Sequence, residues 1–193
     1  MTEPGSPVVL VVDDEPDVAD SYAAIAGERY DVRTGYSGEQ ALSKLDDDVD
    51  VVLLDRRMPD ILGDEVLSTI RDRAIDCRVA MVTAIDPDIE IIDMEFDDYV
   101  VKPVTREELL ETIERMLRVA EYERTLREYY RVTRKHVTLS SADEDANITG
   151  DPEFAELEQR REELRERLEQ TADAFADADF ETLFREFEGD FDA

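Results

Sequence analysis

The chain has 193 residues, of which 42% are hydrophobic and 38% charged, and its formal net charge is −30. This length suits one ordinary domain with an appendage, or two small domains. A field of that sign repels phosphate backbones and anionic membranes at moderate salt, which disfavours non-specific binding to either. Only three lysines accompany 19 arginines. An acidic, lysine-poor surface also fits a salt-rich cytoplasm, where salt screens the repulsion.

Several kinds of site are excluded by composition. Cys77 is the single cysteine, so no intrachain disulfide forms, and with one histidine it cannot build a zinc site of the usual kind. No stretch approaches the roughly 18 apolar residues of a membrane-spanning helix, and the first apolar run lacks the basic flank of a signal peptide. We therefore expect a cytoplasmic protein without a membrane partner.

Residues 1–7 form a flexible leader, after which apolar runs alternate with helical patterns. The runs are rich in β-branched residues and lack clean alternation, which is typical of parallel strands covered on both faces. They are Val8–Val12, Tyr30–Thr34, Val51–Leu54, Val79–Val82 and Tyr99–Val101. Two helix starts, Ser37 with Gln40 and Thr105 with Glu108, have capping-box spacing. The pattern predicts an α/β domain over residues 8–118, with a doubly wound parallel sheet of five strands.

A helical segment is predicted over residues 119–193. No Gly or Pro interrupts residues 105–136, so the last helix of the domain should continue to about residue 136. After an acidic loop at 140–151, Pro152 can start a second helix to about 176, and a short terminal helix is expected at about 179–188. Both long helices carry stripes with heptad-like spacing, which predicts a helical hairpin with a coiled-coil-like seam. The stripes are Val119, Tyr122, Leu126, Tyr129, Thr133 and His136, and Leu157, Arg161, Leu164, Leu168, Thr171 and Phe175. Stripes left unpaired within one chain would favour a homodimer.

Polar residues follow four of the predicted strands. Asp13 and Asp14 follow the first, Asp55 the third, Thr83 the fourth and Lys102 the fifth. Because the carboxyl ends of parallel strands share one edge, where ligands of open sheets bind, these side chains should converge. Clustered carboxylates would bind a cation, and hard oxygen ligands suit Mg²⁺. Asp55 could then attack phosphorus, with Lys102 offsetting charge and Thr83 donating a hydrogen bond to the phosphoryl group.

These residues resemble the receiver domain of response regulators. The resemblance rests on Asp13-Asp14, Asp55-Arg56-Arg57-Met58-Pro59 with Gly63, Thr83-Ala84 and Lys102-Pro103, and it covers about residues 8–118. It implies a flavodoxin-like fold with strand order 2-1-3-4-5. It also implies that Asp55 is the phosphoacceptor of a two-component response regulator and receives its phosphoryl group from a sensor histidine kinase.

The resemblance also implies roles for individual residues. Asp14 and Asp55 would ligate the metal directly, Asp13 through water, and Arg57 through its carbonyl oxygen. The amides of Arg57 and Ala84 would contact the phosphoryl group, the Lys102–Pro103 bond would be cis, and Thr83 and Tyr99 would be the switch pair. The segment from Thr83 to Lys102 is about three residues shorter than the common pattern, and the fourth helix, near residues 86–94, takes the loss.

The helical segment resembles the HalX-type segment that follows receivers in halophilic archaea. We expect it to signal by contacts with an unidentified downstream protein. The alternative is direct DNA binding by a basic stripe on the long helix, made of Arg124, Arg127, Arg131 and Arg134. No helix-turn-helix pattern follows residue 120, and residues 137–193 carry 19 acids against 5 bases, which makes DNA the weaker expectation.

A stand-alone enzyme is the main rival reading. Phosphatases of the dehalogenase type also form an aspartyl phosphate, but they carry a second acid two residues after the nucleophile. Here Asp55 is followed by Arg56 and Arg57. We therefore expect a phosphoacceptor that catalyses its own phosphorylation and dephosphorylation, and not a separate enzyme activity.

Overall fold

The computed structural model describes residues 5–87, 89–141 and 151–189, and the side chains of residues 90 and 173–189 lie outside that description. The first residues of the predicted leader and most of the predicted acidic loop therefore lie outside the described residues. The chain divides into two compact units, residues 1–120 and 121–193. Within the described ranges, no helix is both long and apolar enough to cross a membrane.

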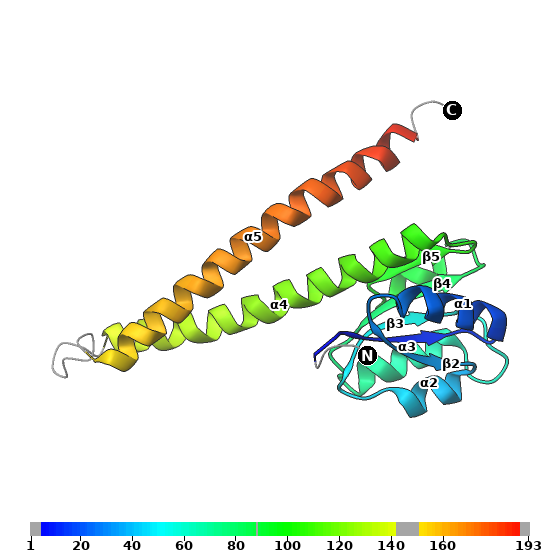
Figure 1. The fold of residues 1–193 in the computed structure, drawn as a ribbon, viewed down its shortest axis with the longest axis horizontal. Coiled ribbons are helices and arrows are strands. Elements are labelled where there is room, and N and C mark those ends of the chain that lie inside the picture. The colour runs from blue at the N-terminus through cyan, green and yellow to red at the C-terminus, as the bar shows by residue number, and fades with distance from the viewer. Residues whose placement is uncertain (1–4, 88, 142–150, 190–193) are drawn as a thin grey trace. The chain divides into compact units, whose positions relative to one another are not determined.

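The first unit is built on a parallel sheet of five strands (Figure 1). The strands are β1 (Val8–Val12), β2 (Asp31–Gly35), β3 (Val49–Leu54), β4 (Arg78–Thr83) and β5 (Asp98–Val101), in the order β2-β1-β3-β4-β5. The fold class and the strand order predicted from the sequence are confirmed. Each predicted strand lies within a few residues of an observed one.

Helices cover both faces of the sheet. The helices of this unit are α1 (Pro16–Ala26), α2 (Gly38–Lys44), α3 (Gly63–Asp72) and the beginning of α4 (Arg106–Ser141). Successive residues of the central strands enter different clusters: Val52 and Leu54 pack with α2 and α3 residues, whereas Val51 and Leu53 pack with α1 and α4 residues. Burial on both faces explains why these strands read as continuous apolar runs.

Two helix starts have the predicted caps. The Ser37 hydroxyl accepts a hydrogen bond from the Gln40 amide at the start of α2. Before α4, the Glu108 carboxylate accepts from the Thr105 amide at 2.8 Å, and the Thr105 hydroxyl accepts from the Glu108 amide at 3.3 Å. Both arrangements satisfy backbone donors that have no partner within the helix.

The fourth helix of the expected pattern is reduced to one short turn. Between β4 and β5 the structure has η1, a 3₁₀ helix over Ile89–Asp93. The expected shortening falls in this segment. Ile89 and Ile92 are 81% and 73% exposed, so this turn buries little apolar surface against the sheet.

The second unit consists of the rest of α4 and of α5 (Pro152–Gly189), which pack against each other. Among the side chains that the structure describes in this unit, the buried ones are Thr125 and Val132 on α4 and Phe154 and Leu164 on α5. Ion pairs join Arg160 to Glu128 at 2.9 Å and Arg167 to Glu121 at 2.8 Å. The predicted C-terminal helical extension is thus confirmed. The α4 stripe predicted from heptad spacing is only half-buried, because the buried α4 positions of this unit, Thr125 and Val132, lie beside it.

The predicted helix ends in this unit need correction. Helix α4 continues to Ser141, beyond the predicted end near 136, and the Thr138 and Ser141 hydroxyls donate to carbonyl oxygens four residues earlier. Helix α5 runs unbroken to Gly189, so the prediction of a separate terminal helix at 179–188 was wrong. The reason is that no Gly or Pro lies between Pro152 and Gly189 to end the helix. The side chain of Phe175, predicted in the second stripe, lies outside the described residues.

Candidate functional site

Three of the predicted site residues meet at the carboxyl end of the sheet. The ammonium nitrogen Nζ of Lys102, which follows β5, lies 2.6 Å from Oδ2 of Asp13 and 2.8 Å from Oδ1 of Asp55. Asp13 and Asp55 are only 2% and 5% exposed. Parallel strands deliver these residues to one edge, so the ammonium pairs with two buried carboxylates.

Backbone groups complete the surroundings of the two carboxylates. The Arg57 amide donates to Oδ2 of Asp55 at 2.7 Å, and the Glu15 amide donates to Oδ1 of Asp13 at 3.1 Å. Each carboxylate therefore has one oxygen bound to Lys102 and the other bound to a backbone amide. Such fixed donors can stabilise charge that develops on these oxygens.

Burial and pairing act in opposite directions on the titration of this site. Burial raises the pKa of Asp55, and the hydrogen bond and charge of Lys102 lower it only in part, so the pKa stays above its usual value of 3.8. Burial lowers the pKa of Lys102, but the hydrogen bonds with Asp13 and Asp55 raise it more. The pairing thus favours a charged Lys102 beside the carboxylates.

The other predicted site residues lie near this edge without joining the ion pairs. Thr83 is buried at the end of β4, and its carbonyl oxygen accepts from the Lys102 amide at 2.8 Å. Ala84 is exposed and Asp14 is half-buried. The Lys102–Pro103 peptide bond is cis. The half-buried Tyr99 donates its hydroxyl to the Ile85 carbonyl at 3.0 Å, and its ring lies 5.5 Å from that of Phe96.

Arg56 is a buried residue that the sequence analysis gave no role of its own. It is 7% exposed, and its Nε donates to both carboxylate oxygens of Asp64 at 3.1 and 3.2 Å. No local sequence pattern indicated this burial, because an arginine is almost never fully buried unless it is paired, and the pairing is set by the fold.

The residues predicted to bind a metal supply oxygen ligands alone. Among the described residues, no three Asp, Glu, His or Cys side chains are grouped so that they could hold a metal ion. Mg²⁺ commonly uses only one or two carboxylates and keeps several waters. The carboxylates of Asp13 and Asp55 and the Arg57 carbonyl therefore fit this ion by donor type.

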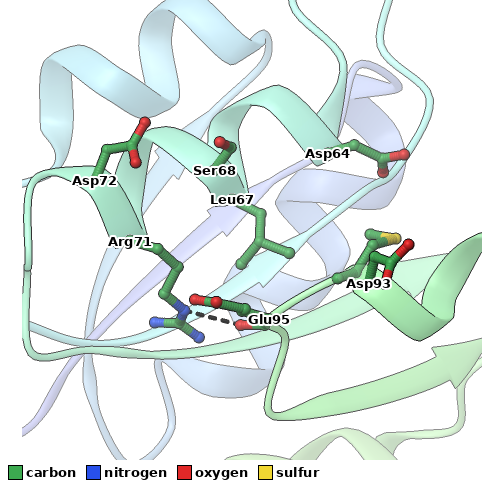
Figure 2. A pocket seen from close by; sticks show the side chains of 8 residues that line it. Asp64, Leu67, Ser68, Arg71, Asp72, Asp93 and Glu95 are labelled. Atoms are coloured by element: carbon green, nitrogen blue, oxygen red, sulfur yellow. Dashed lines mark hydrogen bonds between the residues drawn. The ribbon is translucent and has the colours of Figure 1, made fainter.

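A separate hollow of about 240 Å³ lies between α3 and the segment around η1 (Figure 2). Its lining includes Leu67, Asp64 and Asp93, but none of the residues predicted for phosphoryl transfer. The guanidinium of Arg71 beside it donates to the Glu95 carbonyl at 2.8 Å and to Asp97 at 2.7 Å. Asp64, the partner of Arg56, lies at one end of this hollow.

Comparison with known families identifies the first unit. The sequence profile of the response regulator receiver domain matches residues 9–114. The chain belongs to the response regulator receiver family. The profile of the HalX domain matches residues 118–184, directly behind the receiver domain. The two resemblances expected from the sequence are confirmed.

Relatives share both parts of the chain to different extents. A candidate transcriptional regulator from the halophilic archaeon Haloferax volcanii is 49% identical over 160 residues, which are 82% of this chain and 27% of that protein. The transcriptional regulatory protein TrcR of Mycobacterium tuberculosis is 33% identical over 155 residues, 77% of this chain and 60% of that protein. The chain thus spans between about a quarter and three fifths of the length of these relatives.

Solved structures match the receiver domain. A CheY-like response regulator receiver domain protein from Methanospirillum hungatei has a TM-score of 0.58 at 28% identity, covering 62% of this chain and 99% of that one. The DrrB receiver domain, described as BeF3 activated, has a TM-score of 0.54 at 28% identity, with coverage of 58% and 97%. These likenesses agree with the strand order of the first unit.

Proposed function

We propose that this chain is a phosphorylation-dependent switch of a two-component system in the cytoplasm. A sensor histidine kinase donates a phosphoryl group to Asp55, and the HalX segment passes the signal to a downstream protein. The observation that carries the proposal is the position of Lys102, whose Nζ contacts Asp13 and Asp55 at 2.6 and 2.8 Å. The match of the receiver domain profile to residues 9–114, a range that contains all three residues, supports the proposal.

The transfer follows from the surroundings of Asp55. A carboxylate oxygen of Asp55 attacks phosphorus, the new O–P bond forms, and the bond from phosphorus to the donor imidazole breaks with its electron pair on nitrogen. Lys102 and the Arg57 amide offset the negative charge that gathers on the phosphoryl oxygens. The Thr83 hydroxyl donates a hydrogen bond to the phosphoryl group, and the Ala84 amide donates another.

A divalent metal is part of the proposal. Asp13, Asp14, Asp55 and the Arg57 carbonyl oxygen would hold Mg²⁺, whose charge neutralises oxygens of the transferring group. Asp13 already contacts the ammonium group of Lys102. Its carboxylate can therefore balance the positive charge of Lys102 as well as that of the metal ion. We propose that water attack on the acyl phosphate, without a separate enzyme, later returns Asp55 to its free form.

The experiment that tests this function uses the purified 193-residue chain in high-salt buffer. The protein is incubated with Mg²⁺ and acetyl phosphate, and its intact mass is read, with the Asp55→Asn variant alongside. We expect one base-labile phosphoryl group on the wild type, and none on the variant or without Mg²⁺. Wild-type protein that stays unmodified with acetyl phosphate and with a histidine kinase would contradict the proposal.

Output through protein contacts is the favoured mode, and DNA binding is the second candidate. The exposed α4 residues Arg131 and Arg134 favour DNA, as does the description of the Haloferax relative as a candidate transcriptional regulator. The acidity of residues 137–193 disfavours DNA binding, because their negative charge repels the phosphate backbone. A mobility-shift assay at high salt separates the two. Retention of DNA that is lost on joint replacement of Arg124, Arg127, Arg131 and Arg134 would establish the DNA reading.

A further inference from the structure

In the second unit, the side of α4 that faces away from α5 carries a row of arginines. Thr125 and Val132 are buried and mark the side of α4 that packs against α5. With 3.6 residues per turn, Arg127 and Arg134 fall on the opposite side, and Arg131 lies next to them. All three are exposed. The packing of the hairpin therefore does not explain why these cations are there.

The ion pairs between α4 and α5 do not use these cations either. Arg160 of α5 pairs with Glu128 of α4 at 2.9 Å, so the basic partner comes from α5. In the part of the chain that the structure describes, no ion pair joins Arg131 or Arg134 to a carboxylate. Residues 124–139 have five basic side chains and one acidic one, although the whole chain carries a net charge of −30. This positive surface would attract an acidic partner.

Two large side chains with apolar surface are exposed among these arginines. Tyr130 and Val137 are 62% and 56% exposed, and both fall on the same side of α4 as Arg134. Arg127 forms a pair with Glu123 at 3.8 Å on its own helix. A phosphate backbone offers nothing apolar to cover these side chains, whereas an acidic protein helix with an apolar stripe would. The outer α4 face is the name we give to Arg127, Tyr130, Arg131, Arg134 and Val137.

The sequence of residues 175–193 has the complementary composition. It contains seven acidic residues, one basic residue and five phenylalanines. Phe180, Phe184 and Phe187 recur with the spacing of an apolar stripe on a helix. Helix α5 continues through this region to Gly189. The segment is thus an acidic helix with an apolar stripe, which is the kind of partner that the outer α4 face fits.

This segment cannot reach the outer α4 face of its own chain. The pair of Arg160 with Glu128 sets the register of the two helices. A continuous helix rises 1.5 Å per residue, so position 175 lies roughly 20 Å farther along α5 than Arg160. In addition, α5 packs on the other side of α4. Only another molecule can bring residues 175–193 to this face.

We propose that the outer α4 face binds residues 175–193 of a second copy of this chain. A two-fold axis makes the contact twice, because each copy offers one face and one segment. The contact belongs to the helical unit and does not require phosphorylation of Asp55. Its failure would therefore leave the proposed function intact.

The oligomeric state of the 193-residue chain without a phosphodonor tests this proposal. Light scattering after size exclusion, over a series of protein concentrations in high-salt buffer, should give twice the mass of one chain. Tyr130→Ala combined with Arg134→Glu should raise the dissociation constant of the dimer at least about tenfold, because Tyr and Arg are the side chains that most often dominate binding. Tyr36→Ala combined with Arg73→Glu, at exposed positions of the receiver domain, is the matched control and should leave the dimer unchanged.

A mixing experiment identifies the occupant of the face. Phe180→Ala combined with Phe184→Ala should also raise the dissociation constant at least about tenfold, but this variant keeps an intact outer α4 face. The variant of Tyr130 and Arg134 keeps an intact segment 175–193. At a concentration where each variant alone is monomeric, their mixture should form a dimer, because one of the two contacts is then complete. Circular dichroism checks that both variants keep the helix content of wild type, and if one misfolds, the other is compared with wild type alone.

Three results would overturn the inference. The first is a wild type that stays monomeric over the whole concentration series. The second is a dimer that the folded variants leave unchanged, or folded variants that do not form a dimer when mixed. The third is a monomeric wild type that retains DNA in a mobility-shift assay and loses it in the variant of Tyr130 and Arg134, because the occupant of the outer α4 face would then be DNA.

Discussion

Nζ of Lys102 lies 2.8 Å from Oδ1 of Asp55, although 47 residues separate the two along the chain. The same nitrogen lies 2.6 Å from Oδ2 of Asp13, 89 residues away. One ammonium therefore joins the ends of three strands, β1, β3 and β5. It also keeps two buried carboxylates from facing each other without a counter-charge. The residue that joins the strand ends at this edge is thus the one that we propose to offset charge during phosphoryl transfer.

Replacing Lys102 by Met should impair both stability and phosphorylation. Removing one partner of a buried ion pair leaves charge without compensation, and the free energy of unfolding should fall by about 3 kcal/mol. Loss of a fixed charge at the reacting group should slow phosphorylation by roughly 10²-fold or more. Denaturant unfolding and time-resolved intact mass measure the two effects. Lys135→Met, at an exposed position of α4, is the control. If the Lys102 variant has the same stability and phosphorylation rate as this control, Lys102 has neither role.

The free energy of unfolding of Asp55→Asn, measured relative to that of wild type, should increase as the pH rises from acid values. Burial raises the pKa of Asp55 in the folded chain above the usual 3.8. The stability that protonated Asp55 contributes is therefore complete below 3.8 and is lost as pH rises through the folded pKa. Asn does not titrate. Denaturant unfolding of both proteins across this range checks the sign, and an advantage for Asn that shrinks with rising pH would contradict it.

The contribution of Asp60 to stability should depend on pH in the opposite direction to that of Asp55. Hydrogen bonds from the amides of Glu39, Ile61 and Gly38 lower the pKa of Asp60 to about 2. Its contribution to stability is present above 3.8 and is lost as pH falls toward about 2. Asp60→Asn should therefore flatten the acid limb of the stability curve between these values. Asp72→Asn, an exposed residue at the end of α3, should leave that limb unchanged; equal effects of both variants would rule out this contribution of Asp60.

Gly63→Ala should displace the loop that carries Asp55. A Cβ at Gly63 would lie 2.2 Å from the Asp55 carbonyl oxygen and 2.9 Å from Cα of Arg56, both backbone atoms. Because backbone must move, we expect a loss of about 1–3 kcal/mol in unfolding free energy together with slower phosphorylation. Ser68→Ala on the exposed side of the same helix should change neither. Full activity and stability in Gly63→Ala would show that the close approach is dispensable.

Leu164→Ala should destabilise the pairing of α4 and α5. Leu164 is fully buried, and Leu→Ala changes in such positions cost about 2–5 kcal/mol. Loss of helical signal on heating, followed by circular dichroism, should occur at lower temperature than in wild type. Glu166→Ala, on an exposed position of α5, should melt as wild type does. If Leu164→Ala melts at the same temperature as Glu166→Ala, then packing between α4 and α5 does not stabilise the two helices.

The strands and the site edge were predictable because each depends on local sequence. β-branched runs mark buried parallel strands, and the residues that follow them must share one edge, as Asp13, Asp55 and Lys102 do. The strand order came from the resemblance to receivers. The continuity of α5 was missed, although no Gly or Pro lies between Pro152 and Gly189 to stop the helix.

The burial of Arg56 could not be predicted in the same way. It depends on pairing with Asp64, eight residues later. Pairing of that kind is set by tertiary structure and leaves no periodic signal in the sequence. The half-burial of the predicted α4 stripe has a similar origin, because the positions that face α5 depend on how the two helices are rotated.

The central claim is that Asp55 accepts the phosphoryl group, and locating the modified residue tests it most directly. The 193-residue chain is treated with acetyl phosphate and Mg²⁺ and then reduced with borohydride, which converts a phosphorylated aspartate to homoserine. The digested peptides are sequenced by mass spectrometry. Homoserine at position 55 and at no other acidic position is the predicted result. Homoserine at Asp13 or Asp14, or a phosphoryl group retained on His136 with Asp55 unmodified, would contradict the account.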